Sequence, residues 1–66
     1  MNVTLNGQAR RVATGTTLGS LLRELGLSES GVAVALNARV VARSALEDKA
    51  VHDGDEIEIV RAVAGG

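Results

Sequence analysis

The hydrophobic pattern of this chain changes its period twice within 66 residues. Residues 1–6 alternate apolar and polar side chains, which is the period of a half-buried strand. A helical spacing follows, carried by Leu18, Leu21, Leu22 and Leu25. Residues 56–60 return to alternation. A chain of this length forms one domain, so these segments are expected to share a single small core.

The first strand is expected to turn back on itself at Asn6-Gly7. Both residue types tolerate the positive φ of a type I′ turn, so the pair predicts a β-hairpin whose second strand covers residues 8–12. A two-residue loop would pair Leu5 with Gln8, and a three-residue loop would pair Leu5 with Ala9. The pattern leaves both registers open.

The ends of the helix are marked by small and polar residues. Thr16 is the expected N-cap, because its hydroxyl can accept a hydrogen bond from an N–H of the first turn. A capping box is not expected, since the third helical position would then be Gly19 rather than Glu or Gln. Gly26 suits the left-handed residue just past the helix. Gly19 inside the helix is interpreted as a place of close packing against a strand.

The second half of the chain reads as two strands joined by short connections. Residues 32–36 are apolar throughout, which predicts a strand with both faces at least partly covered. A shorter strand is expected over residues 39–42. A single helical turn is expected within 44–49, with Ser44 as its cap and Leu46 as its anchor. The remaining connections are a loop at 28–31 and turns at 37–38 and 52–55.

The resulting order, β-β-α-β-β-turn-β, predicts an α+β domain. We expect a mixed sheet of four to five strands with one main helix across one face. If the last strand lies parallel beside the first, the sheet closes around the helix as a β-grasp. The domain is expected to span residues 1–63, followed by a flexible tail at 64–66.

Composition excludes several classes of function. The chain has no aromatic residue, so it lacks the side chains on which single-stranded bases stack, and its net charge of −1 provides no electrostatic footprint for nucleic acid or a membrane surface. The absence of Cys excludes disulfides, thiolate metal sites and Cys nucleophiles. The longest apolar run, residues 32–36, is too short to span a membrane, and no signal-peptide pattern is visible. A cytoplasmic protein is expected.

Polar residues within the domain do not suggest an active site. His52 is the only histidine and lies in an expected turn, where a solvated role is favoured. Asp53, Asp55 and Glu56 lack the ligand pattern of a calcium loop, so no metal site is expected. A solvated surface is also favoured over a partner surface for the scattered arginines, which are Arg10, Arg11, Arg23, Arg39, Arg43 and Arg61. We therefore expect neither catalytic residues nor a bound cofactor.

The final pair, Gly65-Gly66, is the one compositional anomaly. Glycine has no Cβ, so such a tail could thread a narrow channel and bring its backbone close to the catalytic centre of another protein. An enzyme could activate the terminal carboxylate with ATP as an acyl-adenylate, and a nucleophile could then displace AMP. The alternative is a frayed end without a role.

The tail is more specific in combination with the rest of the chain. Residues 54–59 read Gly-Asp-x-Ile-x-Ile, and residues 63–66 read Val-Ala-Gly-Gly. Together with Asn6-Gly7, the Gly-Thr-Thr-Leu sequence at 15–18 and the Val-Ala-Leu-Asn sequence at 34–37, this pattern resembles the ThiS family of bacterial sulfur carriers in thiamine biosynthesis. The resemblance covers the whole chain.

The resemblance implies a ubiquitin-like fold and a carrier that is a substrate of other enzymes rather than an enzyme. In that family the C-terminal glycine, here Gly66, is adenylated by an E1-like activating enzyme that uses ATP. Sulfur from a cysteine-desulfurase relay then converts the adenylate to a thiocarboxylate, which is delivered to thiazole synthase. Gly65, Ala64 and Val63 are implied to place Gly66 in the active sites of these partners. A monomer is expected when the carrier is free.

Other functions share parts of this pattern. The small subunit of molybdopterin synthase has the same fold and Gly-Gly end, but its tail commonly contains Pro, which this chain lacks. A ubiquitin-like modifier would join Gly66 to a lysine of a target, and an interaction module would have an inert tail. For the sulfur carrier, docking is expected on an aliphatic patch of the outer sheet face, as in other ubiquitin-like domains. Its candidate residues are Val34, Leu36, Val40, Val41 and Val60.

Overall fold

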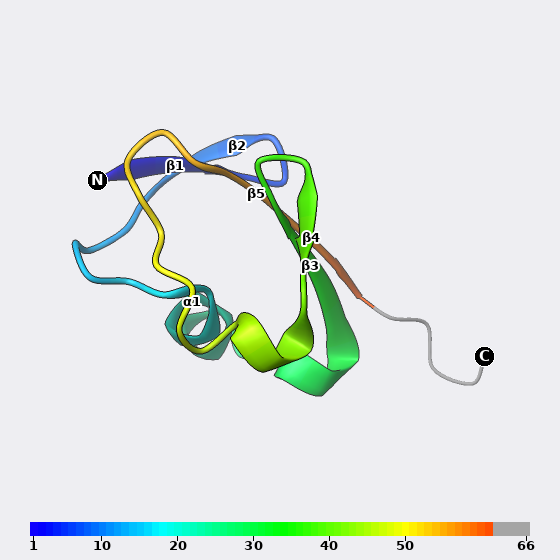
Figure 1. Ribbon diagram of the computed structural model, residues 1–66. Coiled ribbons are helices and arrows are strands. Elements are labelled where there is room, and N and C mark those ends of the chain that lie inside the picture. The colour runs from blue at the N-terminus through cyan, green and yellow to red at the C-terminus, as the bar shows by residue number, and fades with distance from the viewer. Residues whose placement is uncertain (62–66) are drawn as a thin grey trace.

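The computed structural model describes residues 1–61 of the chain, with its elements in the order that the hydrophobic pattern predicts. One α-helix packs against one face of a five-stranded sheet (Figure 1). No helix in this described part is long and apolar enough to cross a membrane. The elements are β1 (Asn2–Leu5), β2 (Gln8–Arg11), α1 (Leu18–Glu24), η1 (Glu29–Gly31), β3 (Val32–Leu36), β4 (Arg39–Val41), η2 (Arg43–Ala45) and β5 (Glu56–Arg61).

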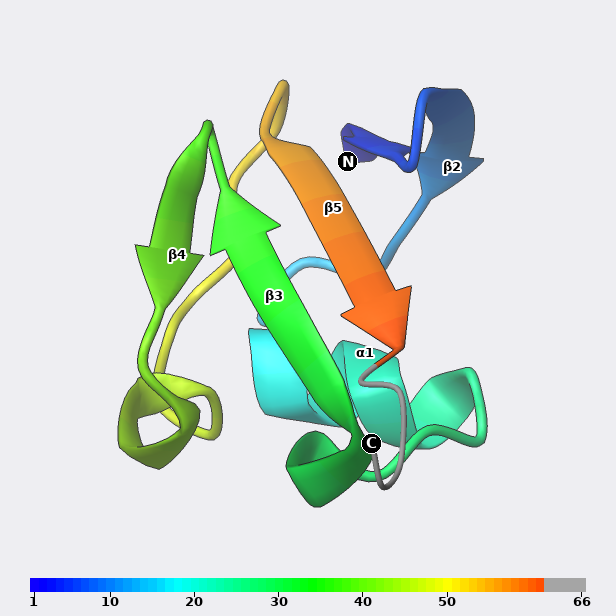
Figure 2. The same ribbon diagram turned by 90° about the vertical axis from the view of Figure 1, so that its right-hand side faces the viewer.

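The sheet has the strand order β2-β1-β5-β3-β4, which places β5 at its centre. β5 runs parallel to β1, with Thr4 opposite Glu56, and antiparallel to β3, with Val34 opposite Ile59. Figure 2 shows β5 between β3 on one side and the β1–β2 hairpin on the other. The last strand therefore lies parallel beside the first, and the predicted α+β class and β-grasp arrangement are confirmed.

Both hairpins use two-residue turns in the left-handed region. Asn6 has φ 49° and Gly7 has φ 83°, and Leu5 pairs with Gln8, so the structure selects the two-residue register. The second turn has Asn37 at φ 52° and Ala38 at φ 70°. These turns match the right-handed twist of the strands they join, which is why positive φ is adopted even by an alanine.

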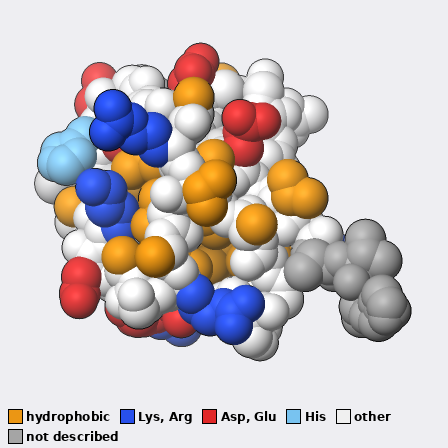
Figure 3. Space-filling view, turned by 45° about the vertical axis from the view of Figure 1, so that its right-hand side comes forward, with side chains coloured by type: hydrophobic (Ala, Val, Ile, Leu, Met, Phe, Trp, Pro, Cys, Tyr) orange, Lys and Arg blue, Asp and Glu red, His pale blue; other side chains and the backbone are white. Residues whose placement is uncertain are grey.

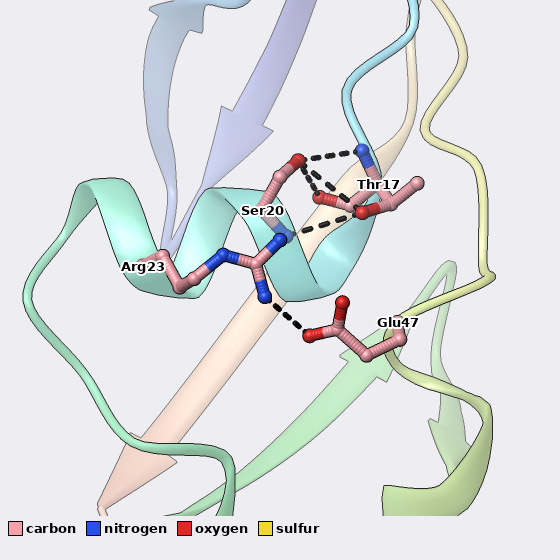
Figure 4. Close-up of polar contacts among 4 residues, drawn as sticks. All are labelled: Thr17, Ser20, Arg23 and Glu47. Atoms are coloured by element: carbon pink, nitrogen blue, oxygen red, sulfur yellow. Dashed lines mark hydrogen bonds and ion pairs between the residues drawn. The ribbon is translucent and has the colours of Figure 1, made fainter.

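The N-terminus of α1 corrects the predicted cap. Thr17, not Thr16, is the N-cap, and the shift of one residue makes Ser20 the third helical position. Thr17 Oγ1 accepts a hydrogen bond from Ser20 N at 3.1 Å, while Ser20 Oγ accepts one from Thr17 N at 2.8 Å (Figure 4). A capping box is thus present, contrary to expectation, with a serine in place of Glu or Gln. Thr16 is buried, and its hydroxyl donates to the Ala13 carbonyl at 2.7 Å.

The C-terminus of α1 ends at a glycine, as predicted. Gly26 has φ 75°, and its N–H donates to the Arg23 carbonyl at 3.0 Å. Leu27 N–H donates to the Leu22 carbonyl at 2.8 Å. These two bonds form a Schellman motif, which satisfies carbonyls that the helix leaves free.

The core fills the space between α1 and the sheet. Leu21 and Leu22 are fully buried, and Ile57 of β5 is 1% exposed. Leu46 anchors the segment that follows β4, as predicted, but Ser44 does not cap it. Ala42 precedes η2 instead and offers no side-chain hydrogen bond.

The apolar run of β3 is buried on one face only, and the other face, predicted to be at least partly covered, is partly covered only at Ala35. Val32, Val34 and Leu36 point into the core, whereas Ala33 is exposed and Ala35 is half-buried. The alternation is hidden in the sequence because the outward positions hold small apolar residues instead of polar ones. Their hydrophobicity therefore reflects the outer surface of the sheet rather than a second core.

Gly19 lies where α1 meets the segment after η2. A Cβ built on this residue would lie 3.0 Å from Glu47 Cα and 2.5 Å from Glu47 Oε2. Gly19 N–H also donates to the Leu46 carbonyl at 2.9 Å, which holds the two backbones together. Close packing is thus the reason for this glycine, but the neighbour is the segment containing Glu47 and not a strand.

Replacing Gly19 with alanine tests this close approach. Helix propensity alone favours Ala by about 1 kcal/mol, whereas overpacking costs about 1–3 kcal/mol. Because the nearest backbone atom would be only 3.0 Å away, we expect Gly19→Ala to lower the free energy of unfolding by about 1 kcal/mol. Urea denaturation measures the change. Gly31→Ala is the matched control, since its Cβ would meet nothing within 4 Å, and a stabilised Gly19→Ala would contradict the packing argument.

Candidate functional site

The residues predicted to carry the function lie beyond the end of β5. Val63, Ala64, Gly65 and Gly66, together with the predicted boundary between residues 63 and 64, fall outside the described residues. β5 ends at Arg61 and leads directly to them. The candidate site is therefore built from β5, from the strands that hold it, and from the surface on either side.

β5 is held along its length by β3 and over its first half by β1. Its pairing with β3 runs from Leu36 opposite Ile57 to Val32 opposite Arg61. On the other side, Thr4 N–H donates to the Asp55 carbonyl and Asn6 N–H to the Ile57 carbonyl, both at 2.9 Å. The strand that precedes the predicted tail thus belongs to the rigid centre of the domain.

The acidic residues before β5 accept hydrogen bonds from the backbone and from the side chain of Asn37. Asp53 Oδ1 accepts from Asn2 N–H at 2.6 Å. Asp55 Oδ2 accepts from His52 N–H at 2.8 Å, and Asp55 Oδ1 accepts from the Asn37 amide at 3.0 Å. Within residues 1–61 there is no group of three or more His, Cys, Asp or Glu side chains suited to a metal ion. The cluster that the sequence singles out therefore shapes the turn.

The hydrogen bonds to Asp55 lower the pKa of its carboxyl group. Burial by itself raises this pKa, but the His52 N–H and the Asn37 amide, which both favour the ionised form, bring it below its usual value. The His52 ring is 79% exposed, with Nδ1 4.0 Å from Asp55 Oδ2. The interpretation of His52 as a solvated turn residue is confirmed.

The outer face of the sheet carries an apolar strip beside β5. Ala33 lies opposite Val60, and Ala35 lies opposite Val40. Val40 is 82% exposed and Val60 is 63% exposed, and the two valines line one shallow hollow with Ala33, Ala35 and Glu58. We call Ala33, Ala35, Val40 and Val60 the outer-face patch. In Figure 3, hydrophobic side chains are spread over this side of the molecule between charged groups.

The register decides which of the five predicted patch residues are available. Val40 and Val60 belong to the outer-face patch. Val34 and Leu36 are buried in the core, and Val41 is half-buried. The sequence could not separate these two groups, because all five are aliphatic and lie on strands whose orientation it leaves open. Ala33 and Ala35 were missed, and only their alternation with three buried residues could have revealed them.

The arginines are distributed over several elements of the fold. Arg10 and Arg11 lie on β2, Arg39 on β4 and Arg61 at the end of β5. Arg23 and Arg43 are brought together around one hollow that also contains Glu29 and Glu47.

Arg23 forms an exposed ion pair with Glu47 across this hollow (Figure 4). Contact with Glu29, and then with Arg23, lowers the pKa of Glu47, while the neighbouring Glu47 carboxyl raises the pKa of Glu29. An exposed pair of this kind contributes little to stability. The structure therefore pairs Arg23 with an acidic partner and places Arg43 beside the same hollow.

The lowered pKa of Asp55 predicts how stability depends on pH. A carboxyl whose folded-state pKa lies below its ordinary value of 3.8 stabilises the fold above that pH, and the contribution is lost as pH falls through the folded pKa. We expect Asp55→Asn to lower the free energy of unfolding by about 1 kcal/mol at neutral pH. Below pH 3.8 the difference in free energy of unfolding between the variant and wild type should become smaller. Urea unfolding at several pH values tests this. The exposed Asp48 provides the control Asp48→Asn. If the free energies of unfolding of wild type and Asp55→Asn changed with pH in parallel, the stabilising role of the Asp55 carboxylate would be contradicted.

Comparison with known proteins identifies the family. A sequence profile of the ThiS family matches residues 3–66. The chain is 36% identical to the sulfur carrier protein ThiS of Escherichia coli over the full length of both chains. It is also 39% identical over 66 residues to a thiazole synthase of Paramagnetospirillum magneticum, but it spans only 20% of that protein's length.

The fold leads to the same family. A crystal structure of the thiamine biosynthesis protein ThiS from Geobacter metallireducens matches this chain with a TM-score of 0.85 and 35% identity, covering all of both chains. Sequence and structure thus agree from one end of the domain to the other, and the protein belongs to the ThiS family.

Proposed function

We propose that this protein is a sulfur carrier for thiamine biosynthesis, and that Gly66 carries the sulfur as a thiocarboxylate. The observation that carries the proposal is the full-length likeness to a protein named sulfur carrier ThiS, in a family whose profile extends through Gly65 and Gly66. The likeness is not confined to the core, because it includes the part of the chain where the chemistry would occur.

The proposed chemistry takes place on the carboxyl group of Gly66. A carboxylate oxygen attacks the α-phosphate of ATP in the activating enzyme, and pyrophosphate leaves. The terminal sulfur of a persulfide from the desulfurase relay then attacks the acyl carbon, and AMP leaves with its electron pair. A thiol reductant cleaves the S–S bond of the resulting acyl disulfide, which frees the thiocarboxylate and leaves the two remaining sulfurs joined as a disulfide. The activation matters because a free carboxylate resists nucleophilic attack, whereas an adenylate provides a good leaving group. The mechanism requires a free carboxylate on Gly66.

We assign no catalytic residue and no bound cofactor to this chain, so it acts as a substrate of its partners. The polar side chains nearest the start of β5 support this assignment, because Asp53, Asp55 and Asn37 are occupied by hydrogen bonds that hold turns. The proposed partners are an E1-like adenylating enzyme, a cysteine-desulfurase relay and a thiazole synthase. A monomeric carrier in the cytoplasm would meet all three.

The link to thiazole synthase has support of its own. This chain matches about a fifth of a protein that is named thiazole synthase, at 39% identity. The protein named thiazole synthase therefore contains a segment similar to this whole domain. Such a connection is expected if the carrier and the synthase must meet in each catalytic cycle, since a covalent link raises their effective concentration.

Docking is proposed to use the outer-face patch. Val60 lies next to Arg61, the last described residue before the tail, so an enzyme that binds this patch also receives the tail close by. Exposed apolar side chains grouped on a small domain are typical of protein-binding surfaces. Glu58 lies within the same hollow and adds one charged group for specificity.

The carrier chemistry is tested by intact mass. Incubation with the host's activating enzyme, ATP, a cysteine-desulfurase sulfur source and a thiol reductant should replace one oxygen of the chain by sulfur. Fragmentation should place the change on Gly66. A chain lacking Gly66 is the control and should remain unmodified. An unchanged wild type in the presence of demonstrably active partners would overturn the proposal, and an amide bond to a lysine of another protein would favour a ubiquitin-like modifier.

The docking surface is tested by Val60→Asp. Placing a charge in the centre of an apolar contact costs more than about 1 kcal/mol when the contact is a binding hot spot. We therefore expect the KM of the carrier for its activating enzyme to rise about tenfold, with little change in Tm. Ala9→Asp, at an exposed position on the edge strand β2, is the matched control. Equal KM values for the two variants would exclude the outer-face patch as the docking surface for the activating enzyme.

A further inference from the structure

β5 loses its strand partner on one side before it reaches its end. β1 pairs with β5 only at Thr4 opposite Glu56 and at Leu5 opposite Ile57. The chain then turns away at Asn6-Gly7 into β2. β3 continues on the other side as far as Arg61. The last part of β5, which leads to the carrier tail, would therefore be supported from one side alone.

The side chain of Asn6 supplies the missing support. In a parallel ladder, a residue whose N–H donates to one carbonyl of the neighbouring strand offers its own carbonyl to the N–H two residues further on. Asn6 N–H donates to the Ile57 carbonyl at 2.9 Å, which would make the Ile59 N–H the next donor. The oxygen that accepts from Ile59 N–H, at 2.8 Å, is Asn6 Oδ1. Asn6 Nδ2 then donates to the Ile59 carbonyl at 3.2 Å.

The amide of Asn6 thus imitates one peptide group of a strand that is no longer there. The amide group of Asn supplies both a donor and an acceptor, which is what a peptide group offers. Asp lacks the donor, and Gly would allow the turn without any side-chain bond. Asn also tolerates the left-handed conformation that starts the hairpin. One residue therefore serves the turn and the ladder together.

We propose that Asn6 is a positioning residue for the carrier tail. By holding Ile59 on the side that β1 has left, it fixes the direction of Val60 and Arg61, the last two residues of β5 before the tail. The inference rests on the proposed function, since it concerns how the tail is presented to the activating enzyme. A tail that leaves a fixed strand end has less conformational freedom to lose on binding. Loss of the Asn6 amide should therefore raise KM more than it changes kcat.

Asn37 offers a matched control in the same sheet. Its backbone also adopts the left-handed conformation, with φ 52°, in the two-residue turn of the other hairpin. Its Oδ1 accepts from Glu56 N–H at 2.9 Å, so it also bonds to the backbone of β5 through its side chain. This contact lies at the start of β5 and not toward the tail. Glycine tolerates the left-handed conformation of both turns, so Asn6→Gly and Asn37→Gly should each keep the turn. Each variant removes the side-chain hydrogen bonding of that asparagine to the backbone of β5.

The first test measures hydrogen exchange of the free protein by NMR. Asn6→Gly should accelerate exchange at the Ile59 amide relative to global opening, because that amide loses its acceptor. Asn37→Gly should instead accelerate exchange at Glu56. Asn6→Asp keeps an acceptor for Ile59 and should restore much of its protection. An unchanged exchange rate of the Ile59 amide in Asn6→Gly would contradict the proposal that the Asn6 side chain holds this part of β5.

The second test measures pyrophosphate release by the activating enzyme at several carrier concentrations. Asn6→Gly should raise the KM of the carrier about tenfold with kcat within about twofold, since the lost order is restored only on binding. Asn37→Gly should leave both near wild type. If the wild type is adenylated and the two variants have equal KM values, the positioning role of Asn6 is overturned and the proposed function is left intact. A wild type that is not adenylated would instead overturn the proposed function.

Discussion

The pairing of β5 with β1 is the contact on which the rest of the structure depends. It joins the last described strand to the first in parallel, although the two strands lie at opposite ends of the described chain. Because β5 also pairs with β3, it links two hairpins that would otherwise have no common sheet. The three strands together form the surface on which α1 lies. A parallel pair needs a long crossover connection, and here the connection contains the helix and the second hairpin.

A small core without aromatic residues supports this arrangement. The helix contributes leucines and the sheet contributes Val3, Val34 and Ile57, while Leu46, which follows η2, adds a further buried side chain. Aliphatic side chains bury less area than aromatic ones, so the backbone contacts at turns and caps carry more weight in a domain of this size. The capping box of α1, the Schellman motif and the two asparagine turns are contacts of this kind.

The division of labour within the chain follows from these contacts. The described domain uses its polar side chains to hold turns and strand ends, and it leaves an apolar strip on the outer face beside β5. In the proposed function, the chemistry is placed on the carboxyl group of the tail, where a partner supplies the catalytic groups. Such a carrier needs a rigid strand end and a recognisable face more than it needs an active site. The proposed clamp at Asn6 and the proposed docking at the outer-face patch are two consequences of that requirement.

The sequence by itself determined the element order, the α+β class, the core leucines of α1 and the resemblance to the ThiS family. These depend on local periodicity, turn residues and a short motif near the end of the chain, all of which are independent of how the elements pack. The tertiary structure decided the hairpin register, the helix cap at Thr17 and the face on which each aliphatic strand residue lies. It also revealed the contacts of Asn6 and Asn37 with β5. The faces of the strand residues and the contacts of Asn6 and Asn37 depend on atoms that are far away along the chain and are brought close only by folding. The hairpin register and the helix cap join residues only three apart, and they are local geometries that the residue types alone do not distinguish.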